Sequence, residues 1–99
     1  MILSSAIQLP CGAVLKNRIA KAAMTEGLAD TQGVPTPELQ RLYGIWSDGG
    51  AGLQISGNIH IDADHLERAG NVFFGGQPDE AMMDALKSWT KAATRNGNH

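Results

Sequence analysis

The stretch that decides the fold reads Leu15-Lys16-Asn17-Arg18-Ile19-Ala20-Lys21-Ala22-Ala23-Met24-Thr25. Its part Arg18–Met24, in which Lys21 interrupts the apolar residues, predicts a short buried strand that ends in small residues and one hydroxyl. A second apolar run, Ala51–Ser56, is interrupted by Gln54 and predicts a strand covered on both sides. We therefore expect two buried strands, each followed by small residues.

A helix is expected between the two strands. Thr36 suits the N-cap, Pro37 suits the first helical position, and Glu38 complements the positive end of the helix dipole. Residues with helical spacing give this helix one apolar face, made of Leu39, Leu42, Tyr43 and Trp46. We interpret that face, including its two aromatic residues, as core. Gly49-Gly50 ends the helix.

The flanking segments carry further signals. Pro10-Cys11-Gly12 separates Ile7–Leu9 from Ala13–Leu15 and predicts a hairpin. Gly57–Gln77 predicts a long polar loop. A second helix is expected from Pro78, with Gly97 as its C′ residue. Its apolar stripe consists of Met82, Leu86, Trp89 and Ala93. The ending Asn96-Gly97-Asn98-His99 is similar to a turn that precedes a third strand.

The expected order, a hairpin followed by β-α-β-α, indicates an α/β fold with a parallel sheet. Periodicity does not distinguish a doubly wound sheet from a barrel. A (β/α)8 barrel typically needs about 250 residues, whereas this chain has 99. Two parallel strands with uncovered edges leave little core. We therefore expect the chain to be incomplete on its own and to need the remainder of a barrel or self-association.

Composition excludes several classes of partner. The formal net charge of −2 gives no basic surface for nucleic acid. No apolar run approaches the roughly 20 residues that a membrane span needs. The lone Cys11 has no internal disulfide partner, and the start of the chain lacks the features of a signal peptide. We expect a soluble cytoplasmic protein.

The candidate chemistry lies where the two strands end. Small residues at Ala22-Ala23-Met24 let a flat ring approach the main chain, and the Thr25 hydroxyl can donate a hydrogen bond to a ring carbonyl. The alternative is that this segment is a tightly packed turn, and that Gly57 is a turn glycine. A further cluster, His60, Asp62, Asp64 and His65, has metal-binding residue types, but we interpret it as a solvated loop. No catalytic residue and no metal ligand is predicted.

The three stretches Leu15–Thr25, Gly33–Thr36 and Gly49–Gly57 together resemble the N-terminal part of the Old Yellow Enzyme family of FMN-dependent NADH:flavin oxidoreductases. The resemblance implies that residues 1–99 are the N-terminal segment of a (β/α)8 TIM-barrel domain. It also implies FMN contacts for five residues: Ala22, Ala23 and Met24 under the isoalloxazine, Thr25 at its O4 edge, and Gly57 by its backbone.

Two departures from the family pattern fall at this place. The family commonly has Pro where this chain has Ala23, and Asn58 replaces the usual alanine or threonine. Ala adopts the same backbone, so the resemblance still implies cofactor binding, with a looser turn. Lys16-Asn17-Arg18 also matches the family, and we expect it to tie the hairpin to the floor of the barrel.

The resemblance implies an oxidoreductase that uses NAD(P)H and FMN to reduce an activated alkene of the enone type. This chain would supply one wall of the flavin site, while later strands would hold the FMN phosphate and the substrate, so the segment alone is expected to be inactive. The alternative, from another class, is a truncated, non-catalytic product or small interaction module that keeps the βα pattern.

Overall fold

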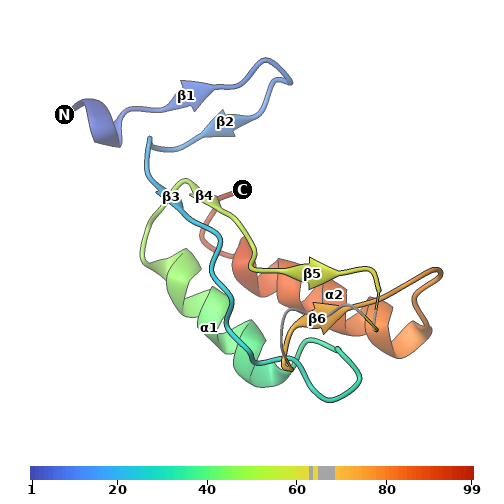
Figure 1. Cartoon of the computed structure of the whole chain (residues 1–99). Helices are drawn as coiled ribbons and strands as arrows, with labels where there is room; N and C mark the ends of the chain where they lie inside the picture. Colours follow the sequence, from blue (N-terminus) through green and yellow to red (C-terminus); the bar gives the residue numbers. More distant parts are fainter. Residues whose placement is uncertain (63, 65–68) are drawn as a thin grey trace.

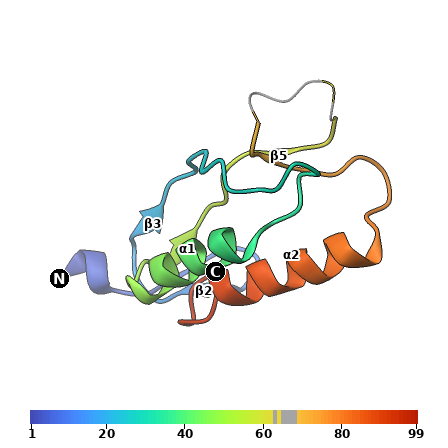
Figure 2. The same cartoon turned by 90° about the horizontal axis from the view of Figure 1, so that it is seen from below.

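The computed structural model describes residues 1–62, 64 and 69–99. Within these residues the elements follow in the order η1 (Ile2–Ser4), β1 (Ile7–Gln8), β2 (Val14–Leu15), β3 (Ala20–Lys21), α1 (Pro37–Asp48), β4 (Leu53–Gln54), β5 (Ile59–His60), β6 (Val72–Phe73) and α2 (Glu80–Ala93), as can be followed in Figure 1. Figure 2 shows the two helices along one side of the molecule and the segments that follow β3 and β4 on the other side.

The expected hairpin is confirmed. β1 and β2 pair antiparallel, with Ile7 opposite Leu15 and Gln8 opposite Val14. The turn between them is closed by the bonds from Leu9 N to Ala13 O (2.8 Å) and from Gly12 N to Leu9 O (2.9 Å). The hairpin lies at the N-terminal end of the chain, next to the start of β3 (Figure 1).

β3 and β4 form the expected β-α-β unit around α1. They pair in parallel, with Ala20 opposite Leu53 and Lys21 opposite Gln54. His99 binds the other edge of β4, because its N–H donates to Gly52 O (3.0 Å) and its carbonyl accepts from Gln54 N (2.8 Å). This is the hydrogen-bond pattern of a parallel neighbour. His99 thus takes the place of a parallel neighbour of β4, and the strand expected after this turn stays a prediction.

Asn17 holds the start of β3 against the start of β4. Its side-chain amide donates to Gly50 O (2.7 Å), and its Oδ1 accepts from Gly52 N (2.8 Å). Beside it, the Lys16 ammonium binds Asn96 O (2.7 Å) and Arg18 Nε binds Ser5 Oγ (2.9 Å). The expected structural role of Lys16-Asn17-Arg18 is confirmed at the end of the strands opposite the candidate site.

The two strands are shorter and more exposed than the sequence predicted. Of Arg18–Met24 the ladder includes Ala20–Lys21, and of Ala51–Ser56 it includes Leu53–Gln54. The expected burial is wrong in the described part of the chain, since Met24 is 47% exposed and Ile55 46%. The helices cover one face of this pair, whereas burial of both faces requires a second layer.

The α1 helix begins as predicted. Thr36 Oγ1 accepts from Leu39 N (3.2 Å), and Pro37 is the first helical residue. The core cluster joins this helix to α2 and β6 through Leu39, Tyr43, Val72 and Trp89, with Leu86, Ala93 and Trp46 packed against it. Both expected helical faces therefore contribute to the core, although Leu42 is only half-buried and Met82 is buried outside this cluster.

The ends of α2 differ from the prediction. Helix α2 begins at Glu80, and Asp79 is its N-cap, whose carboxylate accepts from Met82 N (2.8 Å). Asp79 displaces the expected start at Pro78 because its side chain satisfies a free N–H of the first turn. At the other end Thr94 is the C-cap, so Gly97, with φ of 75°, forms the turn after the helix.

The described residues of Gly57–Gln77 include regular structure where a polar loop was predicted. It contains β5 and β6, which pair in parallel with Ile59 opposite Val72. The segment also binds the connection before α1, through the bonds from Phe73 N to Gly33 O (3.1 Å) and from Ala29 N to Gly70 O (2.8 Å). These long-range contacts, which local sequence does not encode, explain why the prediction of a loop was wrong.

Candidate functional site

The five residues expected to contact a cofactor lie at one edge of the β3–β4 pair. Ala22, Ala23, Met24 and Thr25 directly follow β3, and Gly57 lies three residues after β4. Since the strands are parallel, both segments leave the sheet at the same end. Ala22, Ala23 and Met24 are exposed, Thr25 is half-buried and Gly57 is buried. The exposure of the first three residues leaves this edge open to a flat ring.

The two segments touch. A Cβ built on Gly57 would collide with the Met24 carbonyl oxygen and with the Glu26 carboxylate. Next to it, the Asn58 amide donates to Thr25 Oγ1 (3.1 Å). Thr25 and Gly57 therefore lie close together, as expected for residues that follow the ends of neighbouring parallel strands. Asn58, one of the two departures from the family pattern, contacts Thr25.

Tyr43 reaches this place from α1. Its side chain is 1% exposed. Its hydroxyl accepts from Gly57 N (2.9 Å) and donates to Glu26 Oε1. The sequence interpretation of Tyr43 as core is right for the ring and incomplete for the hydroxyl. A buried tyrosine hydroxyl needs a polar partner, which is the signal that would have placed it near a strand end.

Lys21 lies on the helix side of the same unit. Its ammonium is 5.0 Å from the centroid of the Tyr43 ring and 4.6 Å from that of Trp46. Among the described residues this buried nitrogen has no hydrogen-bond partner. Burial lowers the pKa of Lys21, and the negative charge of Glu26 opposes that change. The sequence marked Lys21 as the polar exception in its strand without indicating this aromatic contact.

The surroundings of Tyr43 also change its acidity. Burial raises the pKa of Tyr43 far above its ordinary value of 10.0, and the hydrogen bond to Glu26 raises it further. The unfolded chain releases this proton near pH 10, whereas the folded chain keeps it. Above pH 10 the folded state thus binds more protons, and its stability falls as the pH rises.

We therefore expect the Tyr43 hydroxyl to stay protonated well above pH 10 in the folded protein expressed from its complete reading frame. The difference in tyrosinate absorbance between the wild type and Tyr43→Phe measures this during an alkaline titration. The signal should appear only when the protein unfolds, and the free energy of unfolding of Tyr43→Phe should depend less on pH above 10. A wild-type titration near 10.0 in the folded protein would contradict the burial of this hydroxyl.

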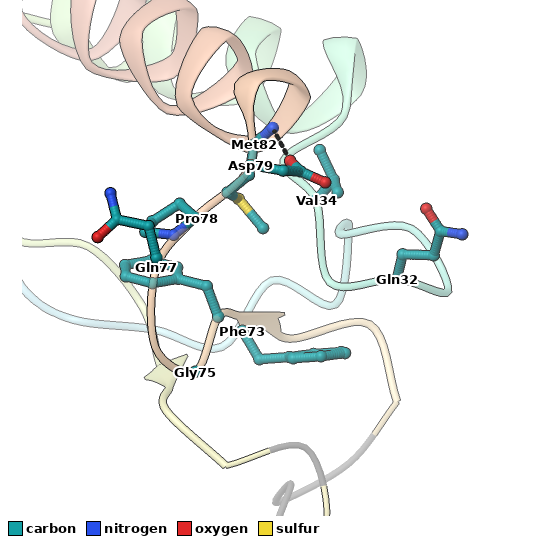
Figure 3. A pocket seen from close by; sticks show the side chains of 9 residues that line it. Gln32, Val34, Phe73, Gly75, Gln77, Pro78, Asp79 and Met82 are labelled. Atoms are coloured by element: carbon teal, nitrogen blue, oxygen red, sulfur yellow. Dashed lines mark hydrogen bonds between the residues drawn. The ribbon is translucent and has the colours of Figure 1, made fainter.

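A hollow of about 350 Å³ lies elsewhere, between the connection before α1, the end of β6 and the start of α2. Figure 3 shows that the Asp79 carboxylate at its edge turns back to its own helix, where it binds Met82 N. Its lining includes none of the five expected cofactor-binding residues.

The stretch with metal-binding residue types is partly described. His60 Nε2 is 2.9 Å from the Asn71 amide nitrogen, and Asp62 accepts from Asp64 N (3.0 Å). His65 lies outside the described residues. Within the part of the chain that the structure describes, no group of three such side chains is placed to hold a metal ion.

Among the described residues, no helix has the length and apolar character needed to cross a membrane.

Comparisons with known proteins give consistent matches, although no family model matches the chain. The NADH-dependent flavin oxidoreductase iliE of Neonectria sp. (strain DH2) is 35% identical over 92 residues, which cover 92% of this chain and 12% of that protein. The protein of the same name from Hypocrea jecorina (strain QM6a) is 30% identical, and this chain matches 23% of its length. The chain thus spans less than a quarter of these relatives.

Solved structures agree with this result. The old yellow enzyme homologue from Zymomonas mobilis is 28% identical and superposes with a TM-score of 0.78. The match covers 99% of this chain and 26% of the Zymomonas chain. Morphinone reductase in complex with tetrahydroNAD is 25% identical and superposes with a TM-score of 0.76. That match covers 98% of this chain and 25% of morphinone reductase. The expected fold class is confirmed: this is the first part of a (β/α)8 barrel.

Proposed function

Because this chain is homologous, over nearly its whole length, to the N-terminal part of Old Yellow Enzyme-type flavin oxidoreductases, we propose that it supplies one wall of the FMN site of such an enzyme. The proposal assigns residues 1–99 to the N-terminal segment of a barrel domain. A cytoplasmic location belongs to the same proposal. The observation that carries it is the contact between the Ala22–Thr25 and Gly57 segments at the carboxyl ends of β3 and β4, where barrel enzymes bind their ligands.

The residues present fit a flavin. Ala22 and Ala23 carry no atoms beyond Cβ and are exposed, so a planar ring can lie against their main chain. Thr25 brings a hydroxyl to the same edge, and Gly57, which has no side chain, lets the segment after β4 lie directly against Met24 O. We assign the wall of the ring to Ala22, Ala23, Met24, Thr25 and Gly57. We assign the binding of the FMN phosphate to later strands of the barrel, outside this segment.

When bound, the flavin supplies two-electron transfer from NAD(P)H to an activated alkene such as an enone. The role of this chain is to orient the ring and to hold a hydrogen-bond donor at its carbonyl edge. Such a donor stabilises the extra electron density of a reduced ring and so raises its potential. The small-molecule substrate and the nicotinamide are proposed to lie against the face that Ala22–Thr25 leaves free.

We expect Thr25→Ala to make the flavin midpoint potential more negative by about 20–40 mV, which corresponds to the loss of one hydrogen bond worth about 1–2 kcal/mol. Redox titration of the protein expressed from its complete reading frame measures this shift. Thr25→Ser keeps the hydroxyl and serves as the control, with a potential close to that of the wild type. Equal potentials in the wild type and Thr25→Ala would remove Thr25 from the site.

A further inference from the structure

One hydroxyl joins three segments of this chain. Tyr43 Oη accepts a hydrogen bond from Gly57 N (2.9 Å), in the segment after β4. It donates to Glu26 Oε1, in the segment after β3. Tyr43 itself belongs to α1. The two strand ends that carry the proposed flavin contacts are therefore both attached to the same atom of the helix between them.

The helix is the fixed member of this arrangement. The Tyr43 ring packs edge-on against both Trp46 and Trp89, with centroids 5.2 Å away in each case. The ring belongs to the buried cluster that includes Leu39. A close-packed aromatic ring has little freedom to move. The position of its hydroxyl is thus set by the core, and the two segments take their position from it.

The segments themselves leave the sheet before they reach the site. The ladder extends to the bond from Ile55 N to Lys21 O (3.1 Å). Beyond it, side chains bring the segments together: the Tyr43 hydroxyl, the Glu26 carboxylate, and the Asn58 amide on Thr25 Oγ1. Since Gly57 lies directly against Met24 O and Glu26, a small displacement of either segment changes the other.

We propose that the Tyr43 hydroxyl is a positioning group, which holds Gly57 and the Thr25–Glu26 backbone in the mutual arrangement that the flavin ring requires. This inference rests on the proposed function. Glu26 is the acceptor that orients the hydroxyl so that its oxygen faces Gly57 N. At neutral pH a tyrosine hydroxyl is protonated, and this one donates its proton to Glu26 Oε1.

The chain offers a matched control for this hydroxyl. Ser47 lies one turn further along α1, is 1% exposed, and also joins the helix to a distant segment. Its Oγ accepts from Asn96 N (3.0 Å) and donates to Asn98 Oδ1 (2.5 Å). Tyr43→Phe and Ser47→Ala therefore each remove one buried hydroxyl that accepts from a backbone N–H and donates to a side-chain oxygen. Tyr43 alone of the two contacts the proposed flavin wall.

The test compares these two variants in the protein expressed from its complete reading frame. Without flavin, hydrogen exchange of the Gly57 amide should become about tenfold faster in Tyr43→Phe, because this N–H loses its acceptor, and stay unchanged in Ser47→Ala. With flavin, the dissociation constant for FMN should rise on the order of tenfold in Tyr43→Phe, with a shift of the flavin potential. Both flavin properties should stay at wild-type values in Ser47→Ala.

The outcomes separate this inference from the function on which it rests. If the wild type binds FMN and Tyr43→Phe changes neither Gly57 exchange nor the flavin properties, the positioning role is wrong and the proposed function stands. Equal flavin effects in both variants would mean a general loss of packing, which also overturns the positioning role. A wild type that binds no FMN overturns the proposed function and the flavin part of this inference. Gly57 exchange then still decides whether the hydroxyl holds the two segments.

Discussion

Gly57→Ala should destabilise the fold by about 1–3 kcal/mol and reduce FMN affinity by more than tenfold. The cause is steric, since the new methyl group would collide with the Met24 carbonyl oxygen and the Glu26 carboxylate. The φ angle of Gly57 is not among the positive ones, so backbone strain does not contribute. Relief of the collision requires a shift of backbone on one side or the other, and both sides belong to the proposed flavin wall.

Chemical denaturation measures the first effect, and FMN titration of the protein from its complete reading frame measures the second. Gly49→Ala is the matched control, because Gly49 ends α1 with a helical φ of −65° that alanine adopts readily. Its added Cβ would lie 3.1 Å from Trp46 O, a contact that a small adjustment relieves. We expect Gly49→Ala to change both quantities little. Wild-type affinity in Gly57→Ala would show that this close approach has no part in cofactor binding.

The second large effect is expected when the 99-residue chain is prepared by itself. It should form no stoichiometric complex with FMN at micromolar concentration, because tight binding needs a preformed pocket that buries most of the ligand. According to the proposed function, this segment supplies only one wall of that pocket. The preorganisation that offsets the cost of ordering the site comes from neighbouring strands. Quenching of flavin fluorescence measures the binding.

The surfaces beside the β-α-β unit support the same expectation. A groove of about 510 Å³ runs beside β3 and α1, where Ile19 is 51% exposed and Ile45 is 52% exposed. A groove of about 280 Å³ lies beside β4 and α2. Exposed apolar edges of this kind favour association with other chains.

We accordingly expect the isolated chain to be oligomeric or poorly ordered. Its single tyrosine reports loss of order directly, since Tyr43 of a poorly ordered chain should ionise near 10.0 without denaturant, while sedimentation measures the oligomeric state. A monomer with a sharp two-state melt, or a stoichiometric FMN complex, would contradict the need for further strands.

The helices of this fold could be predicted from sequence because their signals are local. Thr36 and Pro37 mark the start of α1, and the spacing of Leu39 and Tyr43 marks its buried face. The start of α2 was misplaced by two residues, since Pro78 and Asp79 are both residues that begin helices. The contact between the cap carboxylate and Met82 N decides between them.

The extent of the strands could not be predicted in the same way. Burial of Met24 and Ile55 depends on elements that pack against both faces of the sheet. The pairing of β5 with β6 depends on distant contacts, among them the bond from Phe73 N to Gly33 O. Such contacts produce no periodic pattern of apolar residues in the local sequence.

The candidate site, too, was predictable only where local sequence sets the position of a residue. Thr25 and Gly57 could be placed together because parallel strands end at the same edge. The roles of Tyr43, Glu26 and Lys21 were missed, since helical periodicity places a ring on a buried face without indicating where its hydroxyl goes. A buried tyrosine and a buried lysine both require partners, and those partners are found only when the chain is folded.

Hydrogen exchange with and without FMN, on the protein expressed from its complete reading frame, tests the central claim most directly. The account predicts that FMN slows exchange at residues 22–25 and 57–58 and leaves the β1–β2 hairpin, beyond the start of β3, unchanged. FMN binding that protects other segments and leaves Thr25 and Gly57 unaffected would contradict it, as would a complete protein that binds no FMN.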